Sequence, residues 1–150
     1  MDPDHATALN QAIRMLCLRH RARASQLLAP LGLHAGQEAL LLELDRSGPQ
    51  IQAQLSDALG CEAPSVTLMA RKLEALGHIR RTTDPTDKRA AVVALTSSGR
   101  TLVTKIKQLW VELAEETARG IPPKTLERLP TILQTMSTNV DGRATVTPRK

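Results

Sequence analysis

Apolar residues recur at helical spacing along most of the chain, and two short runs are instead rich in β-branched residues. From about Ala6 to Ala29 an apolar stripe faces away from Arg14 and Arg21, which predicts a long amphipathic helix. Pro30 and Gly32 follow this stretch and predict its end. The stripe consists of Leu9, Ala12, Ile13, Leu16, Cys17, Ala24, Leu27 and Leu28.

The middle of the chain has the pattern of a helix-turn-helix. A helix from Ala35 to Arg46 contains "ALLLEL", which is apolar on nearly every side and should be buried; "SGPQ" closes it. The segment "IQAQLSDALG" predicts a short helix that stops at Gly60. Another helix begins within four residues, with Pro64 in its first turn and Gly77 just past its end. Two short helices joined by a glycine-containing turn form this motif.

A β-hairpin is expected next, with strands from His78 to Thr83 and from Ala91 to Leu95. The seven residues "DPTDKRA" between the strands exceed the two to five of a usual hairpin loop. Loops of unusual length on a small domain often carry function.

Two helices should complete the chain. Thr96 caps the first, which runs to about Ala118 with an apolar stripe, and "GIPP" breaks the chain after it. The last helix runs from Pro123 to about Thr138, and Pro130 inside it should kink it. The segment "DGRATVTPRK" predicts a frayed basic tail. The stripe of the first of these helices is Leu102, Ile106, Leu109, Trp110 and Leu113.

These elements predict a mainly α fold with a small β-hairpin wing: a winged helix-turn-helix flanked by long N- and C-terminal dimerisation helices. The expected parts are the N-terminal dimerisation helix (1–30), the winged DNA-binding lobe (31–96), the C-terminal dimerisation helices (97–140) and a flexible basic tail (141–150). The terminal apolar stripes have no place on a compact winged lobe, so we expect them to pack against a copy of the chain. A two-fold axis would then set the two recognition helices about 34 Å apart, one duplex turn.

Composition narrows the class of protein. The net charge of +5 and the pI near 9.8 favour polyanionic partners in general. Two cysteines are too few for a disulfide framework or a zinc module, and His5, His20, His34 and His78 are scattered, so we expect neither a metal nor a cofactor. No apolar run approaches the roughly 18 residues of a membrane span and no signal peptide is visible, so a soluble, cytoplasmic protein is expected.

The helix that starts at Pro64 should present two different faces. The core side should hold Val66, Met69, Ala70, Leu73 and Leu76. The opposite side holds Pro64, Thr67, Leu68, Arg71 and Ala75, with Ser65 and Lys72 on one flank. Hydroxyls, an arginine and an exposed leucine suit a DNA major groove, where they can meet base edges, phosphates, guanine and thymine methyl groups. By itself the pattern equally fits an ordinary surface face with one stray leucine.

The hairpin loop concentrates positive charge on Arg80, Arg81, Lys88 and Arg89. Arginine at a loop tip can enter a narrow minor groove, where the negative potential of A·T-rich DNA is strongest. Asp87, two residues before Arg89, can hold that guanidinium in place and reduce the entropy lost on docking. The alternative is a solvated loop of mixed charge.

The same residues carry a resemblance to a known family. "DKRAAVVALT" followed by "SSG", and "LMARKLEALGHIRR" from Leu68 to Arg81, resemble the multiple-antibiotic-resistance regulator (MarR) family. "DPTDKR" is similar to that family's wing tip, with Lys88 where arginine is more frequent. The resemblance covers roughly Leu31 to Leu113. It implies a homodimer of triangular outline whose interlocked end helices hold two winged lobes on a palindromic operator.

In function, the resemblance implies a transcriptional regulator, mostly a repressor, that is released by a small phenolic or other aromatic effector or by thiol oxidation. Individual residues of this chain match the positions at which the family contacts double-stranded DNA. Those of the recognition helix are Ser65, Thr67, Leu68, Arg71 and Lys72, and those of the wing are Asp87 and Arg89. Arg81 and Lys88 join the predicted DNA-binding set through their charge.

Cys17 is the sharpest candidate for a switch, because "RMLCLRH" resembles the family's organic-hydroperoxide sensors. Those sensors use tyrosines around the thiolate, and this chain has no tyrosine; we favour a core position for Cys17 over a sensor. His20, on the same side, could lower the thiol pKa if protonated, or could line an effector pocket with Cys17, Arg23 and Trp110. Cys61, just before the recognition helix, is another thiol whose oxidation could disturb docking, although a plain turn residue is the favoured reading.

Two other classes of function are considered. A winged helix can also serve as a protein–protein or RNA-binding module without operator specificity, and a weak salt dependence of duplex binding would favour that reading. An enzyme is disfavoured, because the sequence has no glycine-rich phosphate loop, no paired His-Glu metal motif and no nucleophile elbow.

Overall fold

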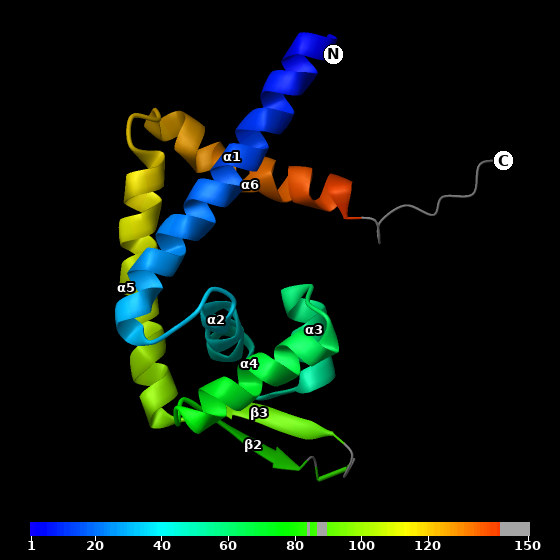
Figure 1. Ribbon diagram of the computed structural model, residues 1–150, viewed down its shortest axis with the longest axis vertical. Coiled ribbons are helices and arrows are strands. Elements are labelled where there is room, and N and C mark those ends of the chain that lie inside the picture. Colours follow the sequence, from blue (N-terminus) through cyan, green and yellow to red (C-terminus); the bar gives the residue numbers. More distant parts are fainter. Residues whose placement is uncertain (84, 87–89, 142–150) are drawn as a thin grey trace, which may run out of the picture. The chain divides into compact units, whose positions relative to one another are not determined.

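The computed structural model describes residues 1–83, 85–86 and 90–141 (Figure 1). The chain forms two compact units, Met1–Leu113 and Ala114–Lys150, and the boundary falls inside helix α5. The helices are α1 (Pro3–Leu28), a short 3-10 turn (Ala29–Leu31), α2 (Gln37–Ser47), α3 (Gln52–Leu59), α4 (Ala63–Ala75), α5 (Ser97–Ala118) and α6 (Pro123–Val140). The strands are β1 (Gln50–Ile51), β2 (Ile79–Thr83) and β3 (Ala91–Leu95). This mainly helical fold with a small antiparallel wing confirms the predicted class.

Helix α1 begins three residues earlier than expected because Asp2 caps it. The Asp2 carboxylate accepts hydrogen bonds from the backbone N–H groups of Asp4 and His5, and Pro3 occupies the first turn. At the other end Gly32 has a φ of 72°, which ends the helical stretch through the 3-10 turn. The predicted long N-terminal helix is therefore confirmed, with a better N-cap than its hydrophobic pattern reveals.

The winged lobe has a core of aliphatic side chains. Helices α2, α4 and α5 supply most of it, and α1, α3 and the sheet supply most of the rest. Helices α3 and α4 are joined through Gly60 at a φ of 61°. The fully buried large side chains are Leu28, Leu40, Leu41, Leu55, Leu73, Ile106, Val66, Val93 and Val103. Within "ALLLEL", Leu40, Leu41 and Leu44 are buried as predicted and the other three residues are half-buried. The predicted helix-turn-helix is confirmed.

The sheet has three antiparallel strands in the order β1-β3-β2. In the β2–β3 hairpin Arg81 lies opposite Val93, and Arg80 lies opposite Ala94. Strand β1 was not expected. It contains only two residues, of which Gln50 pairs with Val93. A segment this short shows no alternation of apolar and polar residues in the sequence. The wing tip at 84 and 87–89 lies outside the described residues.

Helix α5 starts at a tight junction with the end of α4. The hydroxyl of Thr96 accepts a hydrogen bond from the N–H of Gly99 at 3.1 Å and donates one to the carbonyl of Gly77 at 2.7 Å, which confirms the predicted cap. A β-carbon added to Gly99 would lie 2.0 Å from the carbonyl oxygen of His78. Glycine is required here because the two backbones approach so closely.

The second unit contains α6, whose side chains are half-buried or exposed. Pro122 precedes it and Pro130 lies inside it, as expected. The apolar positions of α6 include the exposed Ile132 and Leu133. Most of the predicted basic tail, residues 142–150, lies outside the described residues.

Candidate nucleic-acid interface

Helix α4 presents the two faces that its sequence predicts. Val66, Ala70 and Leu73 are buried, and Met69 is half-buried. Leu76 was expected in the core but is 53% exposed. The reason is that α4 ends at Ala75 and Gly77 turns the chain at a φ of 76°, so Leu76 caps the helix instead of continuing its buried stripe.

The opposite face of α4 is open to solvent. Leu68 is 55% exposed although it is a large apolar residue. Ser65, Arg71 and Lys72 are exposed beside it. The helix therefore carries a hydroxyl, two cations and an apolar group on a single accessible surface, the combination that base edges and phosphates can use.

Thr67, also predicted to contact DNA, is half-buried and has partners within the lobe. Its hydroxyl donates to the carbonyl of Ala63 at 2.9 Å and accepts from the side-chain amide of Gln52 at 3.1 Å. Gln52 is the first residue of α3, so this pair holds the two helices of the motif in register. One lone pair of the hydroxyl is left for a further donor.

Arg81 of β2 is hydrogen-bonded to Glu74 of α4 (Figure 1 shows β2 and α4). Its Nε donates to Glu74 Oε2 at 2.8 Å, and its backbone N–H donates to Oε1 at 3.2 Å. The hydrogen bond from Arg81, helped by the guanidinium charge, holds the pKa of Glu74 below its ordinary value. Much of the Arg81 charge is thus balanced inside the lobe, and the pair ties the wing to α4. The sequence analysis did not predict this role for Glu74. The only indication in the sequence is that Glu74 is an acidic residue in the last turn of a helix that is followed by a short turn and a strand.

Of the remaining wing residues, Asp87, Lys88 and Arg89 lie outside the described residues, so their predicted roles stay predictions. Arg80 is described and exposed. Successive side chains of a strand point to opposite faces, so Arg80 points away from the face on which Arg81 meets α4.

The four residues proposed for a switch lie on α1 and α5, within the first unit. Cys17 and His20 are exposed on α1, whereas Arg23 pairs with Glu112 at 3.6 Å and Trp110 packs against the core. Cys17 therefore does not lie in the core of the single chain, which corrects its expected core position: within α1 only Ala24 and Leu28, near the C-terminal end of the helix, are buried. Cys61 is exposed as well, and its thiol faces the carbonyl of Leu59 at 3.5 Å.

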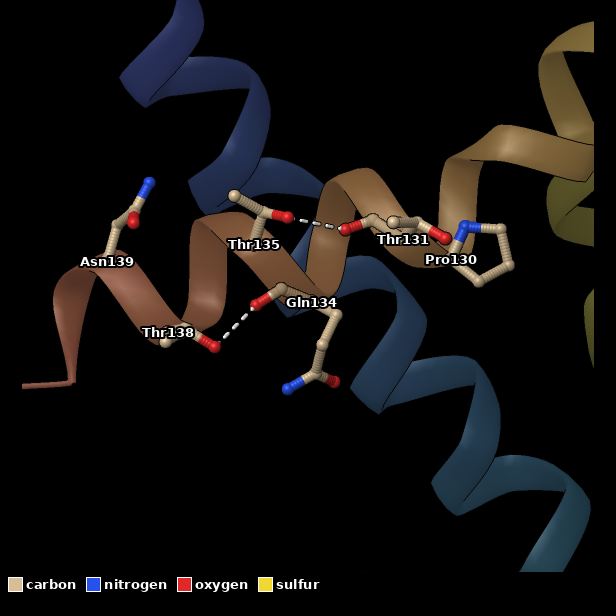
Figure 2. Close-up of a pocket in the computed structure, with 6 residues that line it drawn as sticks. All are labelled: Pro130, Thr131, Gln134, Thr135, Thr138 and Asn139. Carbon is tan, nitrogen blue, oxygen red and sulfur yellow. Dashed lines mark hydrogen bonds between the residues drawn. The ribbon is translucent and has the colours of Figure 1, made fainter. Parts of the chain in front are cut away.

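A hollow of about 500 Å³ lies along α6, in the second unit (Figure 2). Its lining comes from α6 alone, and two of the threonine hydroxyls are bound to helix carbonyls, Thr135 to Thr131 and Thr138 to Gln134. It offers no charged group and no second wall, so we assign it no role. Within the described ranges no three His, Cys, Asp or Glu side chains are grouped to hold a metal, and no described helix is long and apolar enough to span a membrane.

Comparison with known proteins agrees with this geometry. A model of the MarR family matches residues 33–91. The chain is 31% identical over 108 residues to YwoH of Bacillus subtilis, an uncharacterized HTH-type transcriptional regulator, an alignment that covers 72% of this chain and 75% of that protein.

Solved structures share the fold along most of the chain. BpsR of Bordetella bronchiseptica, whose DNA binding is regulated by 6-hydroxynicotinic acid, matches with a TM-score of 0.79 at 25% identity, over 87% of this chain and 98% of that chain. A mutant MarR of E. coli in complex with operator DNA matches with a TM-score of 0.79 at 22% identity, over 91% of this chain and 99% of that chain.

The three-stranded sheet, the helix pair α3–α4 and the solved structures define a winged helix-turn-helix fold. The chain belongs to the MarR family, and it is a transcriptional regulator of that family.

Proposed function

We propose that this MarR-family regulator is a cytoplasmic repressor that binds a palindromic operator as a homodimer. The observation that carries the proposal is the accessible face of α4, on which Leu68 and Arg71 are exposed while the other face is locked into the core. A helix held this rigidly can enter a major groove without losing much conformational entropy.

The proposed division of labour follows from chemistry. Arg71 reads a guanine or grips a phosphate, and Leu68 meets a thymine methyl. Ser65, Thr67 and Lys72 complete the contacts of the recognition helix, and the wing residues Asp87, Lys88 and Arg89 address the minor groove. Arg81 stays in this set in a changed role: through Glu74 it sets the angle between wing and recognition helix.

Dimerisation is supported by apolar surface that the single chain leaves uncovered. On α1, Leu9, Ile13 and Leu16 follow one another at helical spacing, and all are exposed. On α6, in the other unit, Ile132 and Leu133 are exposed. Apolar stripes of this kind favour burial against a second copy, whose two-fold axis would match a palindromic site.

For the switch we propose a small aromatic effector or oxidation of Cys17, with His20, Arg23 and Trp110 of the same unit as the other candidate residues. The regulation of BpsR by 6-hydroxynicotinic acid supports an effector of that chemical class. The exposure of Cys17 makes its thiol accessible to an oxidant in the isolated chain.

The test is a fluorescence-anisotropy titration of the protein against a duplex from its own promoter and against a shuffled duplex, at several salt concentrations. We expect tight binding to the promoter only, with log K falling against log salt by about 0.9 for each phosphate contacted. Peroxide and a phenolic acid, added separately, then identify the switch by which of them releases the duplex. Weak binding that is indifferent to sequence and salt would replace this function with the protein–protein or RNA-binding alternative.

A further inference from the structure

Gln52, the first residue of α3, is joined to α4 by its side-chain amide. Its Nε2 lies 3.1 Å from the hydroxyl oxygen of Thr67, and that hydroxyl oxygen lies 2.9 Å from the carbonyl oxygen of Ala63. A carbonyl oxygen cannot donate, so the hydroxyl hydrogen of Thr67 must point at Ala63. The amide of Gln52 is therefore the donor to Thr67, and this fixes which way the amide is turned.

The rest of the Gln52 amide has no hydrogen-bond partner in the part of the chain that the structure describes. A side-chain amide has two N–H donors and an oxygen that accepts, and the bond to Thr67 uses one of the donors. Among the described residues, no side-chain nitrogen or oxygen is both buried and without a hydrogen bond, so Oε1 of the half-buried Gln52 must reach solvent. One acceptor and one donor of this amide are thus left for another molecule.

The amide lies beside the accessible face of α4. Thr67, which it contacts, is one helical turn before Arg71, so the side chains of these two residues are neighbours on the helix surface. Arg71 and Leu68 are exposed there. Thr67 itself can only accept a hydrogen bond from DNA, because its hydrogen is used within the helix. Helix α3 therefore adds a donor and an acceptor next to the surface that α4 presents.

We propose that Gln52 is a further specificity-determining residue, which reads an adenine of the operator through Oε1 and the free N–H of its amide. In the major groove adenine presents a donor, N6, beside an acceptor, N7, and a glutamine amide matches both. Guanine presents two acceptors, and a backbone phosphate presents acceptors only, so either would leave Oε1 unpaired. The inference rests on the proposed operator binding and deepens it, because it assigns a base to a residue outside α4.

Thr67 acts in this reading as a positioning residue for Gln52, beside its own proposed contact. A flexible glutamine side chain loses rotamer entropy when it docks on a base. The hydrogen bond to Thr67 holds the amide before DNA arrives, so less entropy is lost on binding. Thr67→Val keeps the shape of the side chain and removes this anchor, so it should reduce the adenine preference by less than Gln52→Ala does.

The test compares the parent and Gln52→Ala on the promoter duplex and on its single-base variants, by fluorescence anisotropy with the full chain. We expect the parent to favour adenine at one base pair of each half-site by about tenfold or more. Gln52→Ala should lose that preference and keep those at the other base pairs. Gln54→Ala is the matched control on the same helix: its side chain accepts from the N–H of Ile51, and its loss should leave every base preference unchanged.

A modified base separates base reading from a purely structural role. 7-Deazaadenine lacks the N7 acceptor and keeps the N6 amine, so it tests one of the two predicted hydrogen bonds. At the assigned base pair it should weaken binding of the parent by about fivefold, the value of one hydrogen bond, and should leave binding of Gln52→Ala unchanged.

The proposal fails if Gln52→Ala keeps the preference of the parent at every base pair, or if 7-deazaadenine weakens both proteins equally. A loss of affinity that is uniform over all sequences also overturns it, since Gln52 would then only support α4 or contact a phosphate. A parent that binds promoter and shuffled duplexes equally overturns the proposed function and this inference together. Specific binding by the parent with an unaltered preference in Gln52→Ala overturns this inference alone.

Discussion

The winged lobe and the long terminal helices use the same apolar residue types in different ways. In the lobe, leucines such as Leu41 and Leu55 are completely buried within one chain. On α1, Leu9 and Leu16 are exposed, and α6 contains no buried residue. The lobe is stabilised by its own core, whereas apolar faces of α1 and α6 stay exposed in the single chain, which supports the proposed dimer.

The largest expected effect is on the core of the lobe. Leu41→Ala removes a side chain that is completely buried and should lower the free energy of unfolding by about 2–5 kcal/mol. Denaturant titration measures this change. Leu18→Ala, at an exposed position on α1, is the matched control and should change the same quantity by less than about 1 kcal/mol. Equal losses for both variants would remove the distinction between the two regions.

A comparable effect is expected at the start of α5. Gly99→Ala places a methyl group against the carbonyl of His78, so the junction must shift, at a cost of about 1–3 kcal/mol or more. Thermal unfolding followed by circular dichroism measures the loss. Ser98→Ala, the matched control one residue earlier, removes a hydrogen bond to the His78 ring and should cost about 1 kcal/mol or less. An unchanged melting temperature for Gly99→Ala would show that this contact is not tight.

Substitutions on the exposed apolar face of α1 should change the dimer dissociation constant and leave the stability of the lobe unchanged. Ile13→Asp places a carboxylate in the proposed dimer interface and should raise the dimer dissociation constant at least about 100-fold, because a buried unpaired charge costs about 3 kcal/mol or more. Sedimentation equilibrium measures the constant. Arg14→Asp, at the next residue on the polar side of α1, should change it far less. Dimers that tolerate Ile13→Asp would place the interface elsewhere.

Base recognition should depend on the accessible face of α4. Arg71→Ala should relax preference by about 1–3 kcal/mol at one base pair of each half-site, which a binding assay over single-base operator variants measures. Arg46→Ala, on α2, where the guanidinium binds Glu43, is the control and should leave base preference unchanged. A loss with Arg71→Ala that is uniform over all sequences would make Arg71 a phosphate contact.

The smallest expected effect concerns the link between wing and α4. The pKa of Glu74 is held below its ordinary value of 4.5, so the pair stabilises the fold above that pH and ceases to do so as pH falls through the lowered pKa. The difference in melting temperature between the parent and Glu74→Gln should therefore be present at pH 6 and vanish in the acid range. The pKa of Glu43 is lowered too, chiefly by a hydrogen bond from Gln50, but Glu43 is common to both proteins and its effect cancels. A difference that persists unchanged at low pH would contradict the pairing.

The fold could be predicted where local rules act alone. Gly60 and Gly77 delimit the helices of the motif, and Thr96 caps α5, because turns and caps depend on a few adjacent residues. Leu76 was placed wrongly because it is the C-cap of α4, where the turn at Gly77 takes the chain off the buried stripe that the helical period extrapolates. The accessible face of α4 was also visible in the sequence, apart from the hydrogen bonds of Thr67.

The engagement of Arg81 by Glu74 could not be predicted from the sequence. The two residues are seven apart, and they meet only because the turn after α4 brings β2 back beside that helix. The exposure of Cys17 likewise depends on which part of α1 packs against the lobe, and the hydrophobic pattern around Cys17 does not show this. Pairwise contacts and exposure are consequences of tertiary packing, and they decide which charges remain available for a ligand.

The central claim is that two lobes, held together by their terminal helices, act on one operator. The most direct measurement is the mass of the complex between the full chain and a promoter duplex, by sedimentation velocity, compared for the parent and Ile13→Asp. We predict two chains per duplex for the parent, and a binding affinity that falls sharply for Ile13→Asp although its lobe remains folded. One chain per duplex, with the same affinity for both proteins, would contradict the account.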